Sequence, residues 1–101
     1  MIKITYSSGE PPSLTVKGHS GYGKHGTDIV CASVSALFVT LANSVAEFTD
    51  DAVRTRCEPG DGFIEWREAA SKEGGLLLNA ALLGMRDVAE MYPEHVEFNI
   101  V

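Results

Sequence analysis

The chain has 101 residues, of which 45% are hydrophobic and 22% charged, and this length and composition fit one globular domain over residues 1–101. Fourteen acidic residues against eight basic ones give a formal net charge of -6, which argues against direct nucleic acid binding and favours a basic peptide or protein as partner. The N-terminus lacks the basic start and long apolar run of a signal peptide, and no stretch approaches the length of a membrane span. We therefore expect a cytoplasmic protein without a membrane segment.

The two cysteines, Cys31 and Cys57, belong to no CxxC pair, so we expect reduced thiols rather than a disulfide. A zinc site normally takes four ligands at paired spacings, and the cysteines and histidines show no such pairing. The sequence therefore predicts neither a metal nor another cofactor.

Alternating apolar and polar residues predict two strands, over residues 2–6 and 14–16, joined by a turn at 8–12. They form a β-hairpin in this interpretation. Residues 18–26 follow, with four glycines. Because glycine loses more backbone freedom on ordering than other residues, we expect a mobile loop there.

Apolar residues at helical spacing predict a helix from Asp28 to about Phe48, with either Thr27 or Asp28 as its N-cap. Alternation over residues 53–57 and 63–67, separated by a glycine-containing turn, predicts a second hairpin. Two strand pairs thus flank one helix.

A second helix is expected from about Gly75 to Tyr92, where Pro93 ends it. Its apolar residues occupy much of the circumference, so it needs burial on more than one side. Residues 96–100 alternate as a final strand. The order ββαββαβ predicts an α+β fold, in which two helices pack with a mainly antiparallel sheet.

Cys31 falls in the first turn of the first predicted helix. Unpaired N–H groups and the positive dipole end at such a position favour a thiolate. His19 precedes the glycine-rich loop, and the strand–loop–helix path permits its ring to reach Cys31. A Cys–His pair would supply a nucleophile and a proton carrier for peptide hydrolysis, with backbone amides near Cys31 holding the oxyanion.

Each of these residues also has a plain structural interpretation. A helical cysteine such as Cys31 is often buried, and Asp28 is either only an N-cap or also the group that orients His19. Ser35, one turn after Cys31, either faces the same cleft or is an ordinary polar helix residue.

The remaining cysteine and histidines are predicted to lie outside the chemistry. Cys57 alternates with charged residues in its strand and is interpreted as a core residue. His25 is interpreted as a solvated loop residue, although it competes with His19 for the role of base. His95 is interpreted as solvated surface.

Two nearby segments carry a distinctive pattern. They are Gly18-His19-Ser20-Gly21-Tyr22 and Gly26-Thr27-Asp28-Ile29-Val30-Cys31-Ala32-Ser33-Val34-Ser35. Their GHxGY element, short glycine-bearing spacer and GxDIVCAxVS element closely resemble the signature of the ribosomal-processing cysteine protease family, Prp. The predicted element order over essentially the whole chain is similar to the family fold.

The resemblance implies a bacterial protease that removes the N-terminal extension of the twenty-seventh large-subunit ribosomal protein, a basic substrate, during ribosome assembly. It places the nucleophile at Cys31 and the base at His19, with supporting roles for Asp28 and Ser35. It further implies a homodimer and a flexible active-site loop containing Gly21, Tyr22, Gly23 and Gly26.

Two other classes of protein remain open from the sequence. One is a non-catalytic acidic module that binds a ribosomal protein, and the other is a thiol redox sensor that uses Cys31 without an obvious resolving cysteine. The Cys31–His19 pair favours the enzyme, because binding alone needs no reactive thiol.

Overall fold

The structure, a computed structural model, describes residues 1–24 and 26–101. Its elements follow the predicted order ββαββαβ. They are β1 (Ile2–Ser7), β2 (Ser13–Lys17), α1 (Ile29–Phe48), β3 (Val53–Glu58), β4 (Asp61–Trp66), α2 (Lys72–Met91) and β5 (Val96–Ile100). Both predicted hairpins are confirmed, since β1 pairs with β2 and β3 pairs with β4, each antiparallel.

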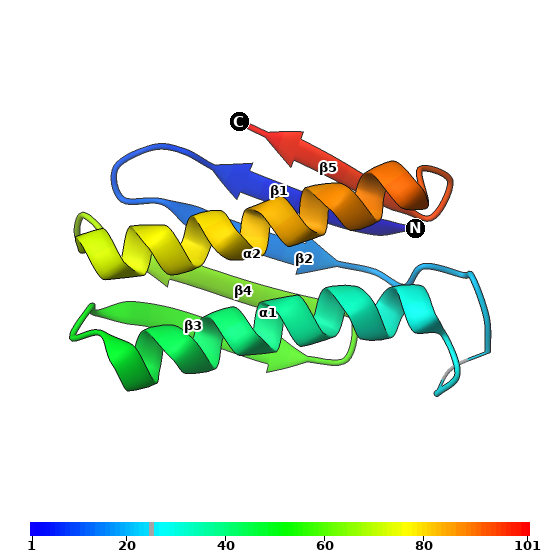
Figure 1. Cartoon of the computed structure of the whole chain (residues 1–101), viewed down its shortest axis with the longest axis horizontal. Coiled ribbons are helices and arrows are strands. Elements are labelled where there is room, and N and C mark those ends of the chain that lie inside the picture. Colours follow the sequence, from blue (N-terminus) through cyan, green and yellow to red (C-terminus); the bar gives the residue numbers. More distant parts are fainter. Residues whose placement is uncertain (25) are drawn as a thin grey trace.

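The strands form one five-stranded sheet in the order β3-β4-β2-β1-β5. All neighbours are antiparallel except β1 and β5, which run parallel. Figure 1 shows α1 and α2 side by side over the same face of this sheet. The prediction of an α+β fold with a mainly antiparallel sheet is therefore confirmed.

The core lies between the two helices and the sheet face that they cover. Ile4 of β1, Leu14 of β2 and Ile64 of β4 are fully buried on that face, because alternate strand residues point to the same side. The helix α1 contributes a stripe at intervals of three and four residues, as expected for one face of a helix. The stripe consists of Val30, Val34, Phe38, Leu41 and Val45.

The opposite face of the sheet is polar and carries ion pairs. Arg54 pairs with Glu65 at 3.1 Å, and Arg56 pairs with Asp61 at 2.8 Å. The guanidinium groups of both arginines also lie over the Phe63 ring, at 5.9 and 5.3 Å from its centroid. This pattern is typical of an antiparallel sheet that has one face in water.

The second helix begins at Lys72, earlier than the expected start near Gly75. Ser71 is its N-cap and accepts a hydrogen bond from Gly74 N at 3.0 Å. Gly74 lies in the first turn of this helix. A glycine is needed there because an added Cβ would collide with the Asp51 carboxylate. Desolvation alone would raise the pKa of Asp51, but hydrogen bonds from Trp66 and Ser71 outweigh it and lower that pKa.

By length and composition, α1 qualifies as a candidate membrane-crossing helix, contrary to the expectation that no stretch is apolar enough. The same composition occurs in helices that form the core of a globular protein. In α1 the buried stripe packs on the sheet, while Thr40 and Asn43 lie on exposed positions. The hydropathy of α1 thus reflects its place in the core.

Candidate active site

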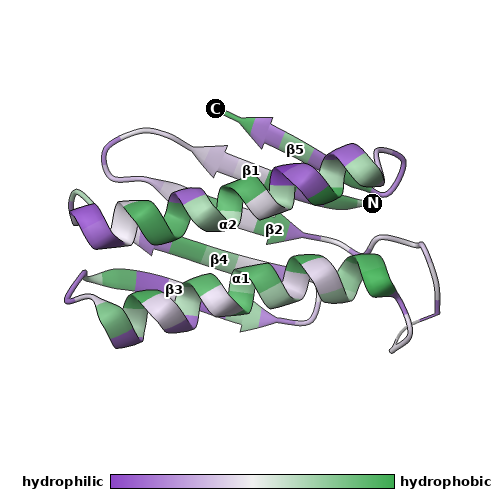
Figure 2. Ribbon diagram, in the orientation of Figure 1, coloured by the Kyte–Doolittle hydropathy of each residue, from purple (hydrophilic) through white to green (hydrophobic). Residues whose placement is uncertain are grey.

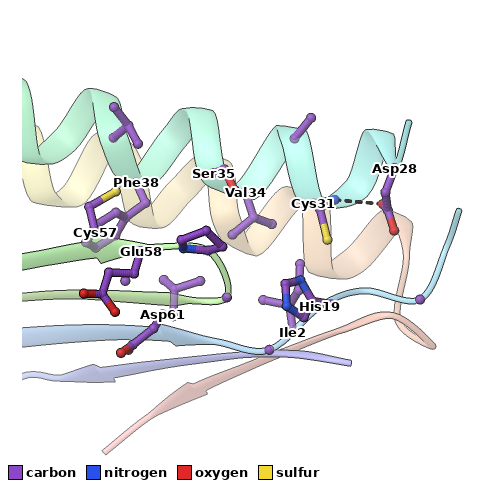
Figure 3. Close-up of a pocket in the computed structure, with 18 of the residues that line it drawn as sticks. Ile2, His19, Asp28, Cys31, Val34, Ser35, Phe38, Cys57, Glu58 and Asp61 are labelled. Atoms are coloured by element: carbon purple, nitrogen blue, oxygen red, sulfur yellow. Dashed lines mark hydrogen bonds between the residues drawn. The ribbon is translucent and has the colours of Figure 1, made fainter. Parts of the chain in front are cut away.

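Cys31 lies in the first turn of α1, and Asp28 is the N-cap of that helix. Asp28 Oδ1 accepts hydrogen bonds from Val30 N at 3.0 Å and Cys31 N at 2.9 Å, the second of which Figure 3 draws. Asp28 rather than Thr27 is thus the cap, which settles the alternative that the sequence left open. The cap fixes the turn on which the thiol sits.

The other carboxylate oxygen of Asp28 holds the glycine-rich loop. Oδ2 accepts hydrogen bonds from Tyr22 N and Gly23 N, both at 3.1 Å, and from the Ser20 hydroxyl. The Ser20 hydroxyl and then the backbone amides hold the pKa of Asp28 far below its ordinary value, although burial opposes them. Five donors fill the roughly four lone-pair positions of a carboxylate, so its acceptor capacity is taken up by the helix end and the loop.

Ser20 lies directly against the thiol. Its backbone N–H donates to Cys31 Sγ at 3.2 Å, and Ser20 is only 3% exposed. This backbone amide is the donor that the structure directs at the sulfur. The sequence assigned no role to Ser20, because its amide carries no side-chain signal and its contact with Cys31 arises only from the path of the loop.

The amides nearest Cys31 are engaged differently from what the sequence suggested. Those of Val30 and Cys31 donate to the Asp28 side chain, and Ala32 N donates to Asp28 O at 3.0 Å. These three donors therefore belong to the cap and helix, and the expectation that backbone amides near Cys31 hold the oxyanion stays a prediction. The amide that faces the sulfur is that of Ser20.

His19 follows β2 and is placed by two glycines with positive φ, Gly18 at 97° and Gly60 at 71°. Gly18 N donates to Gly60 O at 2.9 Å, which ties the end of β2 to the turn between β3 and β4. The His19 ring lies so close to Gly60 that an added Cβ would be 2.8 Å from Nε2. Figure 3 shows Cys31 directed from α1 toward the strand end that carries His19.

Cys31 and His19 line one cavity of about 460 Å³ between α1, the sheet and the β3–β4 turn. Its volume is in the range of small-molecule and peptide-side-chain sites. Ser35 also lines it, as one of the two interpretations of that residue expected. The structure thus brings Asp28, Ser35, Cys31 and His19 together around one space.

Cys57 is also part of this cavity, and its prediction as a core residue is wrong. It is exposed and forms no disulfide with Cys31. Cys57 does point to the helix side of the sheet. However, β3 is an edge strand, and the residue paired with Cys57 on β4 is Gly62. Gly62 has no side chain to lie beside Cys57, because a Cβ there would be 3.2 Å from the Phe38 ring, and Cys57 is exposed.

His95 is not the solvated surface residue that the sequence suggested. It is partly buried, and its Nδ1 lies 2.9 Å from the Ser20 carbonyl oxygen. His25, the competing base, lies outside the described residues. In the part of the chain that the structure describes, no three His, Cys, Asp or Glu side chains gather to hold a metal ion.

Acidic residues stand at the cavity rim formed by the β3–β4 turn. Glu58 and Asp61 both line the cavity, and Glu58 is exposed. The Arg56 hydrogen bond and charge hold the pKa of Asp61 below its ordinary value. Because Arg56 pairs with Asp61, Glu58 is the carboxylate at this rim that no ion pair with another described residue neutralises.

Comparison with known proteins places this geometry in a family. The family model described as cysteine protease Prp matches residues 1–97. Ribosomal processing cysteine protease Prp from two Staphylococcus aureus strains is 26% identical over 101 residues, which cover 97% of this chain and 95% of the relative.

Solved structures agree with the fold. The S. aureus protease Prp in complex with a covalently linked product peptide superposes with a TM-score of 0.93 at 24% identity, with both chains fully covered. SMU.848 from Streptococcus mutans superposes with a TM-score of 0.75 at 31% identity, over all of this chain and 94% of the other. The family match over nearly the whole chain, with a cysteine at a capped helix start, shows that this chain belongs to the Prp family of cysteine proteases.

Proposed function

We propose that this protease removes the N-terminal extension of the twenty-seventh large-subunit ribosomal protein during bacterial ribosome assembly, in the cytoplasm. Its S. aureus relative is named a ribosomal processing protease, and solved structures of that protein hold a substrate peptide and a covalently linked product peptide. The net charge of -6 and the acidic cavity rim would attract a basic precursor at long range.

The proposed reaction uses Cys31 as nucleophile and His19 as acid and base. The Cys31 thiolate attacks the scissile carbonyl carbon, and the imidazolium of His19 protonates the leaving amine, which leaves a thioester. Neutral His19 then takes a proton from water, which restores the imidazolium, while the water oxygen attacks the thioester carbonyl carbon. Breakage of the C–S bond releases the product carboxylic acid and the Cys31 thiolate. Asp28 and Ser35 support the site in this proposal, Asp28 by holding the loop and the helix start.

The observation that carries the proposal is the hydrogen bond from Ser20 N to Cys31 Sγ, in a cavity that His19 also lines. A donor aimed at sulfur stabilises negative charge on it. A structural cysteine would need no such donor, and a simple binding module would need no reactive thiol.

The test is incubation of the purified protein with a ribosomal precursor that carries its extension, followed by mass analysis of the products. Wild-type protein should release the extension at a single site, and Cys31→Ala should release none while still binding the precursor. Cys57→Ala, a change to the other cysteine in the same cavity, is the matched control and should cleave normally. Binding without cleavage by the wild type would favour the acidic binding module instead.

A homodimer is the second part of the proposal. Leu76 and Leu83 on α2 are 70% and 52% exposed. A groove of about 510 Å³ is lined by residues of both α1 and α2. Figure 2 shows hydrophobic segments on the outward side of both helices. A second copy packed on this face would bury the apolar side chains that one chain leaves in water.

A further inference from the structure

The corner that joins α2 to β5 lies at the same end of the molecule as the glycine-rich loop (Figure 1). His95, in this corner, reaches Ser20 across 75 positions of sequence, with Nδ1 at 2.9 Å from the Ser20 carbonyl oxygen. Because a carbonyl oxygen only accepts hydrogen bonds, Nδ1 carries the proton. His95 therefore donates to the residue whose own amide faces the thiol.

The corner is fixed independently of the loop. His95 N and Val96 N donate to Tyr92 O at 2.9 and 3.0 Å, and Ile2 N donates to His95 O at 2.9 Å. These bonds attach the corner to the end of α2 and to the start of β1, an interior strand of the sheet. His95 thus projects from a rigid frame, as a residue that positions another group must.

Tyr22 gives the loop a second contact with the same corner. Its ring lies edge-on to Tyr92 and to His95, with centroids 5.3 Å apart in each case. Such edge-to-face pairs contribute beyond the area that they bury. The loop therefore rests on the corner through one hydrogen bond and two ring contacts.

The consequence for the thiol follows from how Ser20 is held. Its N–H contacts Cys31 Sγ, its hydroxyl contacts Asp28 and its carbonyl accepts from His95. The peptide group before the Ser20 α-carbon is thus held at its N–H, and the peptide group after it is held at its C=O. The peptide group that carries the Ser20 N–H is also held through the His19 carbonyl, which accepts from the Met1 ammonium at 2.6 Å. Release of the Ser20 carbonyl would remove the restraint on ψ of Ser20 and loosen the loop beyond it, so that the direction of the Ser20 amide toward sulfur would vary more.

We propose that His95 is a positioning residue of this protease: its Nδ1–H holds the Ser20 carbonyl so that the Ser20 amide stays directed at the Cys31 sulfur. The proposal rests on the proposed function of Cys31 as the nucleophile. The His95 side chain contacts the Ser20 carbonyl and the Tyr22 ring, and in this proposal it acts on the thiol only through Ser20. The Tyr22 ring contacts support the same placement.

The test compares His95→Leu with His95→Asn in a Cys57→Ser background, so that Cys31 is the only thiol. An asparagine amide donates from nearly the position of Nδ1, whereas leucine fills space without a donor. We expect His95→Leu to lose roughly tenfold in the rate of Cys31 alkylation by iodoacetamide at pH 7, and a similar factor in kcat on the precursor. KM should change little, and His95→Asn should recover most of both rates. Glu94→Gln, on the exposed side of the same corner, should match the parent protein.

Three results would overturn the proposal. The first is parent-like alkylation and kcat in His95→Leu, and the second is an equal loss in the leucine and asparagine variants. If His95→Leu fails to fold, the rate of Cys31 alkylation in Tyr22→Ala tests the proposal instead. This variant removes the two ring contacts between the loop and the corner, and Tyr22 is exposed, so its loss should not unfold the protein. Tyr22→Ala should also slow the alkylation of Cys31, and an unchanged rate in this variant would be the third contrary result. Rapid alkylation of the parent without precursor cleavage would instead reject the proposed function and leave the alkylation comparison valid.

Discussion

Replacement of Gly60 by alanine would test the dependence of activity on the position of His19. Gly60 lies in the turn between β3 and β4 at φ 71°. A Cβ there would be 2.8 Å from His19 Nε2 and 3.0 Å from Cε1, whereas nonbonded heavy atoms settle at about 3.5–4.0 Å. The imidazole must therefore move by about 0.5–1 Å.

The expected loss of activity is large relative to the loss of stability. Displacement of a reacting group by about 1 Å lowers rates by as much as about 10²-fold, so kcat/KM of Gly60→Ala should fall by that order. An alanine at positive φ costs about 1–2 kcal/mol of folding free energy. For a domain of this size, each kcal/mol lowers the melting temperature by about 4–8 °C, so an assay well below the transition separates the two effects.

The assay is kcat/KM on a precursor peptide, with the melting temperature measured in parallel. Gly9→Ala is the matched control, because Gly9 lies in the β1–β2 turn without positive φ and an added Cβ would meet only Ser7 Oγ, at 3.8 Å. It should cleave like the wild type. A folded Gly60→Ala protein with wild-type kcat/KM would refute the reasoning and would favour another base, such as His25.

Three further predictions concern stability and assembly. Because the pKa of Asp28 is lowered in the folded state, its carboxylate stabilises the fold above the ordinary pKa of about 3.9, and this contribution is lost as pH falls through the lower folded value. In urea unfolding, the difference in free energy of unfolding between wild type and Asp28→Asn should thus become smaller toward pH 2, and a difference that stays constant with pH would contradict this. Gly74→Ala should lose about 1–3 kcal/mol by collision with Asp51, whereas Gly75→Ala, with open space around its Cβ, should not. Leu83→Glu should shift sedimentation from dimer to monomer, and a wild type that is already monomeric would exclude the dimer.

Local patterns were sufficient to predict most of the fold. The alternation in each strand and the helical spacing after Asp28 depend on side-chain periodicity, which is visible within a short window. The start of α2 was missed because consecutive glycines at 74 and 75 resemble a break. The need for a glycine at 74 depends on Asp51, which lies in a different segment and contacts the start of the helix.

The site was only partly predictable, for a related reason. Cys31 and Asp28 share one helix start, so their relation is local. Alternation correctly indicated which way Cys57 points, but it could not show that the edge position and Gly62 leave that face uncovered. The contact between His95 and Ser20 joins distant segments through the parallel pairing of β1 with β5, and no short window contains it.

The parallel pairing of β1 with β5 also bears on the order in which this protein folds. The first paired residues, Ile2 and Val96, are separated by nearly the whole chain, and contacts of such long separation form slowly because of the entropy of loop closure. During synthesis β1 and the glycine-rich loop emerge long before the corner that contacts Ser20. Until β5 is in place, β1 has one open edge, and a nascent chain has no His95 to contact the loop. Full thiol reactivity should therefore arise only after the corner and β5 have been synthesised and have paired with β1.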